Sequence, residues 1–458
     1  VCYQEEVRDP SRMAEVLNRV IEKAIRGSAP AQINVPRDYW CQVIDIDLPP
    51  IVRLERQGGG ADAISKAADL LSKAKFPVIL SGAGVVIGGA IEECKKLAEK
   101  LDAPVCNGYQ HNDSFPGSHP LAVGPLGYNG SKAAMELISK ADVVLALGTR
   151  LNPFSTLPGY GIDYWPKNAS IIQVDMNPDR IGLTKKVTVG ISGDAKLVAS
   201  QILEKLSSNA GDTDRQKRKD LIHQTKSAWL QKLSSLDHED DDEGTVWNKE
   251  ARERDKDRMS PRQAWRAIQA GMPEDVIISS DIGNNCAIGN AYPTFEKPRK
   301  YLAPGLFGPC GYGFPSILGA KIGCPDTPVI GFAGDGAFGI SMNEMSSCAR
   351  EEWPAITMVI FRNYQWGAEK RNTTLWYDNN FIGTELDPNL SYAKVADACG
   401  LKGITVKTME ETTAAIKQSC KDQKKGITTF IEVSLNQELG EPFRRDAKKA
   451  PVKVAGIK

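Results

Sequence analysis

An acidic residue and an amide follow two neighbouring apolar runs in the C-terminal half of the chain. Asp335 comes directly after PVIGFAG, and Asn363 comes directly after AITMVIFR. A helix-length segment separates the two runs, which predicts a strand–helix–strand unit in a parallel sheet. Side chains that follow adjacent parallel strands lie at the edge where such sheets bind ligands. Carboxylate and amide oxygens suit Mg²⁺, so the pair is predicted to hold magnesium together with phosphate oxygens.

Glycines flank this acid on both sides. Gly334 and Gly336 are expected to let the backbone turn sharply after the strand. The amides of Gly336 and Ala337 are expected to begin the next helix, where N–H groups and the helix dipole favour phosphate. These residues therefore predict a diphosphate beside the metal.

The order Gly-Asp-Gly, a helix-length segment and then Asn resembles the cofactor motif of thiamine-diphosphate enzymes. The resemblance implies that Asp335 and the Asn363 side chain ligate Mg²⁺, with the carbonyl of Gln365 as a third ligand. Tyr364 stands where the family has a second Asn. This departure is mild, because only the first Asn is a ligand in the family.

Two further stretches fit the same family. In SSDIGNN, Asn284 and Asn285 are candidates for contacts with the diphosphate, the alternative being simple turn residues. In GLFGPCGYG, the resemblance implies that the Gly308 carbonyl meets the aminopyrimidine. Cys310 stands where a bulkier apolar residue often supports the bent cofactor, with core packing as the alternative.

Strands alternate with helices along most of the chain, which predicts an α/β fold of successive parallel sheets. The whole chain resembles the acetolactate-synthase-like family of thiamine-diphosphate enzymes. The expected parts are the end of a pyrimidine-binding domain (1–48), a central Rossmann-like domain (58–206), a charged linker with a helix at 217–233 (207–258), a diphosphate-binding domain (259–435) and a basic tail (436–458).

The first part is expected to be only the end of its domain, as in a chain truncated at its N-terminus. The family's activating glutamate would then lie upstream of Val1, and no glutamate here is expected to replace it. The glycine turn in SGAGVVIGG is weak support for a nucleotide, so FAD is not expected.

The composition gives no drive toward nucleic acid or membrane. The formal net charge is +0, and the apolar runs are strand-length rather than the roughly 20 residues that span a bilayer. The 10 cysteines are scattered, which indicates reduced thiols in a cytoplasmic protein. The acidic run HEDDDE is expected to be solvated rather than to bind metal.

Longer stretches, including NYQWGAEKRNTTLWYDNNFIGTEL and GYQHNDSFPGSHPLAVGPLGYNG, are similar to the sulfoacetaldehyde acetyltransferases of taurine and sulfonate breakdown. The resemblance implies conversion of sulfoacetaldehyde and phosphate to acetyl phosphate and sulfite. Both substrates are anions and call for cationic donors. The candidates are Lys370, Arg371, Arg444 and Arg445, the alternative being surface charges.

Aromatic and histidine residues give weaker signals. Tyr364 and Trp366 are candidates for the pocket wall, with aromatic core as the alternative, and structural roles are expected for His111 and His119. The alternatives for the whole protein are a 2-oxo-acid decarboxylase, an acetolactate-type carboligase, or a non-catalytic relative that kept the fold. The family implies a homodimer or homotetramer.

Overall fold

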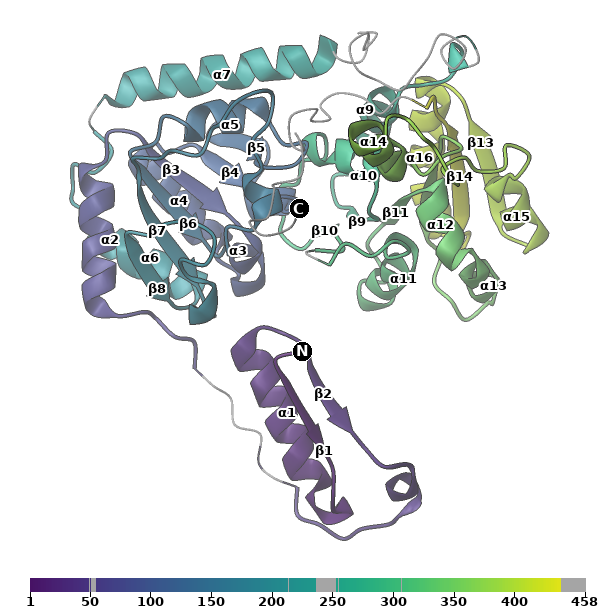
Figure 1. The fold of residues 1–458 in the computed structure, drawn as a ribbon, viewed down its shortest axis with the longest axis horizontal. Coiled ribbons are helices and arrows are strands. Elements are labelled where there is room, and N and C mark those ends of the chain that lie inside the picture. The colour runs from purple at the N-terminus through teal and green to yellow at the C-terminus, as the bar shows by residue number, and fades with distance from the viewer. Residues whose placement is uncertain are drawn as a thin grey trace.

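The computed structural model describes residues 1–437 apart from 49, 51–54, 213, 236–252, 254 and 306; the side chains of 235, 371, 372 and 374–376 are also left undescribed. Three units follow one another along the chain (Figure 1). Among the helices described, none is both long enough and apolar enough to cross a membrane. The parallel α/β fold expected from the sequence is confirmed.

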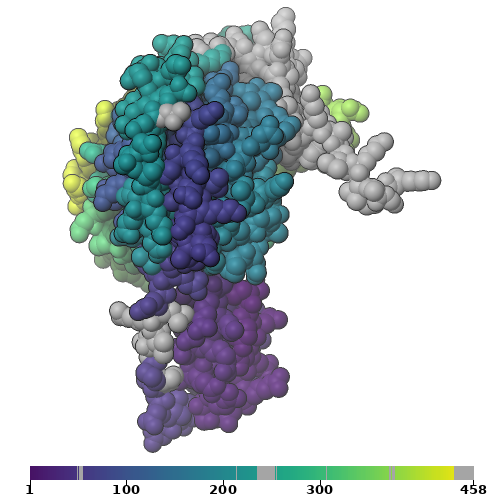
Figure 2. Space-filling model, turned by 90° about the vertical axis from the view of Figure 1, so that its left-hand side faces the viewer, coloured from purple at the N-terminus to yellow at the C-terminus, as the bar shows by residue number. Residues whose placement is uncertain are grey.

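The N-terminal unit is a small βαβ motif. It contains β1 (Tyr3–Glu6), α1 (Met13–Gly27) and β2 (Ala31–Asn34), and the two strands pair in parallel. The residues of β1, YQEE, form no apolar run. Figure 2 shows the unit projecting beyond the rest of the molecule.

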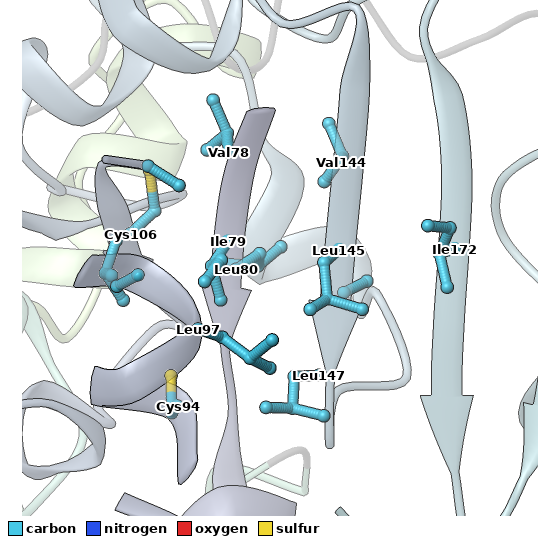
Figure 3. Close-up of a cluster of buried hydrophobic side chains, with 14 of the residues drawn as sticks. Val78, Ile79, Leu80, Cys94, Leu97, Cys106, Val144, Leu145, Leu147 and Ile172 are labelled. Carbon is cyan, nitrogen blue, oxygen red and sulfur yellow. The ribbon is translucent and has the colours of Figure 1, made fainter. Parts of the chain in front are cut away.

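The middle unit contains a six-stranded parallel sheet in the order β5-β4-β3-β6-β7-β8. Its strands are β3 (Pro77–Ser81), β4 (Val105–Asn107), β5 (Ala122–Pro125), β6 (Val143–Leu147), β7 (Ser170–Asp175) and β8 (Val189–Ser192). Its helices are α2 (Ala61–Lys73), α3 (Ala83–Gly88), α4 (Ile91–Leu101), α5 (Lys132–Ile138) and α6 (Ala195–Lys205). Leu80 and Leu145 belong to its buried core, on neighbouring strands that Figure 3 shows beside Leu97.

The C-terminal unit contains a second six-stranded parallel sheet, in the order β10-β9-β11-β12-β14-β13. Its strands are β9 (Ile277–Ser280), β10 (Tyr301–Leu302), β11 (Val329–Gly334), β12 (Thr357–Arg362), β13 (Lys402–Val406) and β14 (Thr429–Ser434). Its helices are α9 (Pro261–Gly271), α10 (Asn284–Ile288), α11 (Gly313–Gly323), α12 (Asp335–Ser341), α13 (Met345–Cys348), α14 (Gly367–Trp376), α15 (Tyr392–Ala398) and α16 (Met409–Gln423).

The segment between the two large units contains α7 (Arg215–Ser235), which spans and slightly exceeds the expected helix. Arg218 is buried and donates to the carbonyls of Leu101 and Asp102 in the middle unit. Trp229 packs against Tyr160 and joins a core cluster of the C-terminal unit. The helix expected within the charged linker is therefore present and, where it is described, packs against both units. These few buried contacts were not predicted because the segment is rich in charged residues.

Candidate cofactor and magnesium site

The structure brings Asp335 and Asn363 together at the carboxyl edge of the second sheet. Strands β11 and β12 are paired in parallel, with Gly334 opposite Phe361. Asp335 follows β11 directly and Asn363 follows β12, so the two side chains meet. The Asn363 amide lies 3.3 Å from Asp335 Oδ1 and 3.2 Å from the carbonyl oxygen of Gln365.

The Asn363 amide can face these two oxygens in either of two orientations. With nitrogen toward them, it donates to Asp335 Oδ1 and to the Gln365 carbonyl, while its oxygen accepts from Asn285 Nδ2 at 3.3 Å. With oxygen toward them, three oxygens converge at spacings close to the roughly 3 Å of neighbouring ligands in a magnesium octahedron. The first orientation suits the protein without metal, and the second suits a bound cation. The residues present therefore fit Mg²⁺.

Asp335 is buried and held by several partners. Its Oδ2 pairs with Arg362 Nη1 at 2.9 Å and accepts from the Tyr364 amide at 2.7 Å. Burial raises the pKa of Asp335 to about 6, although Arg362 and the hydrogen bonds act in the opposite direction. One carboxylate oxygen is thus fixed by the protein, while Oδ1 faces Asn363.

No cluster of three or more His, Cys, Asp or Glu side chains suited to a metal occurs in the part of the chain that the structure describes. A metal beside Asp335 would therefore depend on amide, carbonyl and ligand oxygens rather than on further carboxylates. Mg²⁺ commonly binds in this way, with one or two carboxylates and the phosphates of its partner. The donor set thus favours magnesium carried with a diphosphate.

The glycines beside Asp335 have a different role from the one expected. Gly334 has φ −68°, and the φ of Gly336 is not positive either, so neither needs glycine's freedom to turn. A Cβ on Gly336 would lie 2.9 Å from the Trp366 ring, whereas a Cβ on Gly334 would meet nothing within 4 Å. The Gly336 amide already donates to Asp335 Oδ1 at 3.0 Å. Ala337 follows in the buried first turn of α12. Gly334 therefore leaves open space beside the candidate metal ligands.

The loop after β9 brings two further predicted residues to the same edge. Gly283 has φ 120°, a conformation that favours glycine, and Asn284 and Asn285 begin α10 behind it. Both asparagines are buried. Asn284 Nδ2 and Asn285 Oδ1 have no hydrogen-bond partner among the described residues. Buried polar atoms without partners are uncommon, so these two fit a polar ligand.

Sequence reasoning missed Asp281, which joins this loop to the next one. Its buried carboxylate accepts from the amides of Ile282 at 2.8 Å, Gly311 at 3.1 Å and Gly313 at 2.6 Å. Burial raises its pKa, and these hydrogen bonds oppose the shift. An acid at the end of an apolar run was the available signal. Asp281 therefore fixes the turn that carries Gly308, at φ 62°, and the exposed Cys310.

A cavity of about 750 Å³ lies between the middle and C-terminal units. From the C-terminal unit it is lined by Asn284 and Gly308, and from the middle unit by Gln110, His111 and Arg150. Three residues singled out from the sequence thus face one space, namely Asn284, Gly308 and His111. Ala368 also lines the cavity, so the cavity extends close to the segment that follows Asn363 and Gln365.

The other candidates lie elsewhere. The guanidinium groups of Arg258 and Arg362 lie 4.5 and 4.1 Å from the centre of the Tyr364 ring, and Trp366 packs over Gly336. Neither aromatic residue is among those that line the cavity. Lys370 pairs with Glu385 at 2.5 Å. His119 lies 3.2 Å from Glu99. The side chain of Arg371 and all of Arg444, Arg445 and the HEDDDE run lie outside the described residues.

Comparison with known proteins identifies the class. The model of the thiamine pyrophosphate enzyme central domain matches residues 64–203. The model of the C-terminal TPP binding domain matches residues 281–433, which include the whole Asp335–Asn363 site. The chain therefore carries two domains of a thiamine pyrophosphate enzyme.

Sequence identity to individual relatives identifies the family within this class. A probable sulfoacetaldehyde acetyltransferase from Rhizobium meliloti (strain 1021) is 79% identical over 457 residues, covering 100% of this chain and 77% of the relative. The sulfoacetaldehyde acetyltransferase of Roseovarius nubinhibens is 73% identical, covering 100% and 76%. A probable acetolactate synthase large subunit from Methanocaldococcus jannaschii is 30% identical, covering 90% and 68%. The chain belongs to the sulfoacetaldehyde acetyltransferase family of thiamine pyrophosphate enzymes.

Proposed function

We propose that this protein converts sulfoacetaldehyde and phosphate to acetyl phosphate and sulfite, using thiamine diphosphate and Mg²⁺. The observation that carries the proposal is the match to sulfoacetaldehyde acetyltransferases along the whole chain, at 46–79% identity. The reaction balances: the aldehyde carbon loses its hydrogen as a proton and becomes the carbonyl of the acetyl group, the C–S bond breaks with its electron pair leaving on sulfite, and the methylene carbon gains a proton. Phosphate oxygen forms the new bond to carbon.

The chain's own residues account for cofactor binding. Asp335, the Asn363 side chain and the Gln365 carbonyl would hold Mg²⁺, and Asn284 and Asn285 would meet the diphosphate. When bound, thiamine diphosphate supplies a carbon nucleophile and an electron sink for the aldehyde carbon. Arg362 fixes one oxygen of Asp335, so the other is presented toward the metal. Magnesium binding would favour the carboxylate form of Asp335, against the effect of burial on its pKa.

The test is a sulfite assay with thiamine diphosphate, Mg²⁺ and sulfoacetaldehyde, run with and without phosphate. We expect sulfite, and acetyl phosphate only when phosphate is present. Pyruvate is the matched alternative substrate. Carbon dioxide from pyruvate without sulfite from sulfoacetaldehyde would replace the proposal with a decarboxylase or acetolactate-type carboligase. Failure to bind thiamine diphosphate would instead indicate a non-catalytic relative.

We also propose a homodimer or homotetramer. The N-terminal unit buries only a small cluster around Val7, Val16 and Val20, while Leu17 and Ile25 on α1 are 43% and 60% exposed. Apolar surface of this kind is suited to burial against another polypeptide. Light scattering on the purified protein would give the mass in solution, and a monomer mass would contradict this assembly. Location in the cytoplasm stays a prediction.

A further inference from the structure

The middle unit lines the cavity at the point where the strand order of its sheet reverses. Chain order runs from β3 to β4 on one side and to β6 on the other, and ligands of open parallel sheets bind at such a point. Gly84 and Gly148 follow these strands and approach so closely that a Cβ on Gly84 would lie 2.6 Å from Gly148 Cα. Arg150 follows two residues later and lines the cavity.

Arg150 has no protein partner in the structure as described. Neither a hydrogen bond nor an ion pair joins its guanidinium group to any described residue, although the side chain is half-buried. Burial and the nearby Arg180 lower its pKa, yet the group stays charged because an arginine pKa lies far above neutrality. A half-buried guanidinium that faces a cavity without a partner is suited to bind an anion.

The charged neighbours leave a positive surplus. The groups that act electrostatically on Arg150 are Arg180 and Asp175, and Arg150 in turn acts on His111. His111 stays neutral at neutral pH because burial lowers its pKa to about 4. Asp175 is one negative charge against two guanidinium groups. One donor of Arg180 is already used, because its Nη2 donates a hydrogen bond to the Ser28 carbonyl at 3.0 Å.

A second observation at the same cavity also points to a polar ligand. Gln110 lines the cavity and is only 2% exposed, yet its amide nitrogen and oxygen both lack a hydrogen-bond partner among the described residues. Leaving such groups without partners is costly, which makes a polar ligand the natural complement. An amide and a guanidinium group that line one cavity can both donate hydrogen bonds to an oxyanion.

The other cations considered for the anionic substrates are already used or undescribed. Lys370 pairs with Glu385, and the side chain of Arg371 and all of Arg444 and Arg445 lie outside the described residues. We propose that Arg150, assisted by Gln110, binds the tetrahedral oxyanion of a substrate of the proposed reaction, the chemistry shared by phosphate and sulfonate. The proposal rests on the proposed function for the identity of the anion, and on the cavity for its place.

The test compares Arg150→Gln, Arg150→Lys and a control, Arg350→Gln, in the enzyme loaded with thiamine diphosphate and Mg²⁺. Arg350 is exposed and pairs only with nearby Glu352 among the described residues, so the control makes the same chemical change away from the cavity. Steady-state rates are measured with each substrate varied in turn. Calorimetry measures binding of inorganic phosphate and of ethanesulfonate, a sulfonate without the reactive aldehyde.

Arg150→Gln is expected to raise the KM of the bound anion by about 10–100-fold, with kcat within about threefold, because a charge-assisted hydrogen bond is lost. Binding of the same anion in calorimetry should weaken to a similar degree. Arg150→Lys should retain part of the affinity through its charge, and Arg350→Gln should behave as wild type. If only phosphate binds more weakly, Arg150 binds the acceptor phosphate. If only sulfoacetaldehyde and ethanesulfonate bind more weakly, Arg150 binds the sulfonate group. Weaker binding of both kinds of anion means that they share one site.

Unchanged KM values and unchanged calorimetry in folded Arg150→Gln would overturn the proposal, as would a fall in kcat alone. The two proposals fail in different ways. If wild type releases no sulfite, the proposed function fails, and calorimetry still decides whether Arg150 binds an oxyanion. If wild type binds neither phosphate nor ethanesulfonate, the anion site is rejected whatever the enzyme's activity.

Discussion

The two large units repeat one architecture with opposite chemistry at the ligand edge. Each has six parallel strands, and the strand order reverses between β3 and β6 in the middle unit and between β9 and β11 in the C-terminal unit, where β14 also lies between β12 and β13. At this edge of the C-terminal unit lies a carboxylate, Asp335, with amide and carbonyl oxygens. At the same edge of the middle unit lies the guanidinium group of Arg150, which has no hydrogen bond or ion pair to a described residue.

The comparison separates what the fold does from what the residues do. Parallel sheets bring strand ends together in both units, which provides a place for a ligand. The residue types in the first few positions after each strand then set the charge of the ligand that fits. The oxygen cluster suits a cation, and the guanidinium group suits an anion. The intervening cavity contacts both units, so one space can serve both.

The arginines at the two edges should respond very differently to removal of their charge. Arg362 is 1% exposed and pairs with Asp335, so Arg362→Met leaves a buried carboxylate without its partner and should cost about 3–5 kcal/mol of unfolding free energy. Arg150→Met removes no hydrogen bond or ion pair to a described residue and should change the unfolding free energy by less than about 0.5 kcal/mol. Urea unfolding without cofactor measures both. Similar losses in the two variants would contradict the difference between the edges.

Removal of the acid at the C-terminal edge should abolish metal-dependent cofactor binding. Asp335→Asn deletes the negative charge among the three convergent oxygens, and we expect the affinity for thiamine diphosphate with Mg²⁺ to fall at least about 100-fold. Calorimetry on protein whose folding has been checked by circular dichroism measures this. Asp378→Asn, at an exposed residue of the same unit, is the control. Equal affinities in the two variants would remove Asp335 from the metal site.

Burial of His111 in the middle unit should make the unfolding free energy depend on pH. Since the pKa of His111 is lowered to about 4 from 6.5, the unfolded chain binds more protons than the folded chain between these values. Its contribution to stability is therefore complete above pH 6.5 and is lost as pH falls toward 4, by up to about 3 kcal/mol. The difference in unfolding free energy between wild type and His111→Gln, followed from pH 7 to pH 4.5, measures it.

The strongest sequence patterns predicted most of the fold and the neighbouring positions of the candidate metal ligands. Long apolar runs ending in Asp335 and Asn363 predicted the β11–β12 pairing, and that pairing is confirmed. The strand β1 was missed because its four residues alternate without an apolar run. Local patterns of this kind predict elements that carry a buried face, and they miss short edge strands.

The residues that sequence reasoning missed act through contacts between distant segments. Arg362 ends an apolar run, where a charge in a buried strand was the available signal, and it pairs with Asp335, which follows the preceding strand. Arg150 lies beside the candidate cofactor residues only because two units face one cavity. Gly334 was assigned to a sharp turn that its φ of −68° does not require. Spacing predicts neighbours along a sheet, but not which polar groups remain without partners.

Glycine substitutions offer the finest comparison of the two edges. Gly334→Ala has an ordinary φ and nothing within 4 Å of the new Cβ, so the unfolding free energy should stay within about 0.5 kcal/mol of wild type. Gly84→Ala would bring a Cβ to 2.6 Å from backbone and should destabilise by about 1–3 kcal/mol. If cofactor occupies the space beside Gly334, its affinity should fall about tenfold in Gly334→Ala, about 1.4 kcal/mol. Unchanged cofactor affinity in this fully folded variant would mean that the opening beside Asp335 is not part of the binding site.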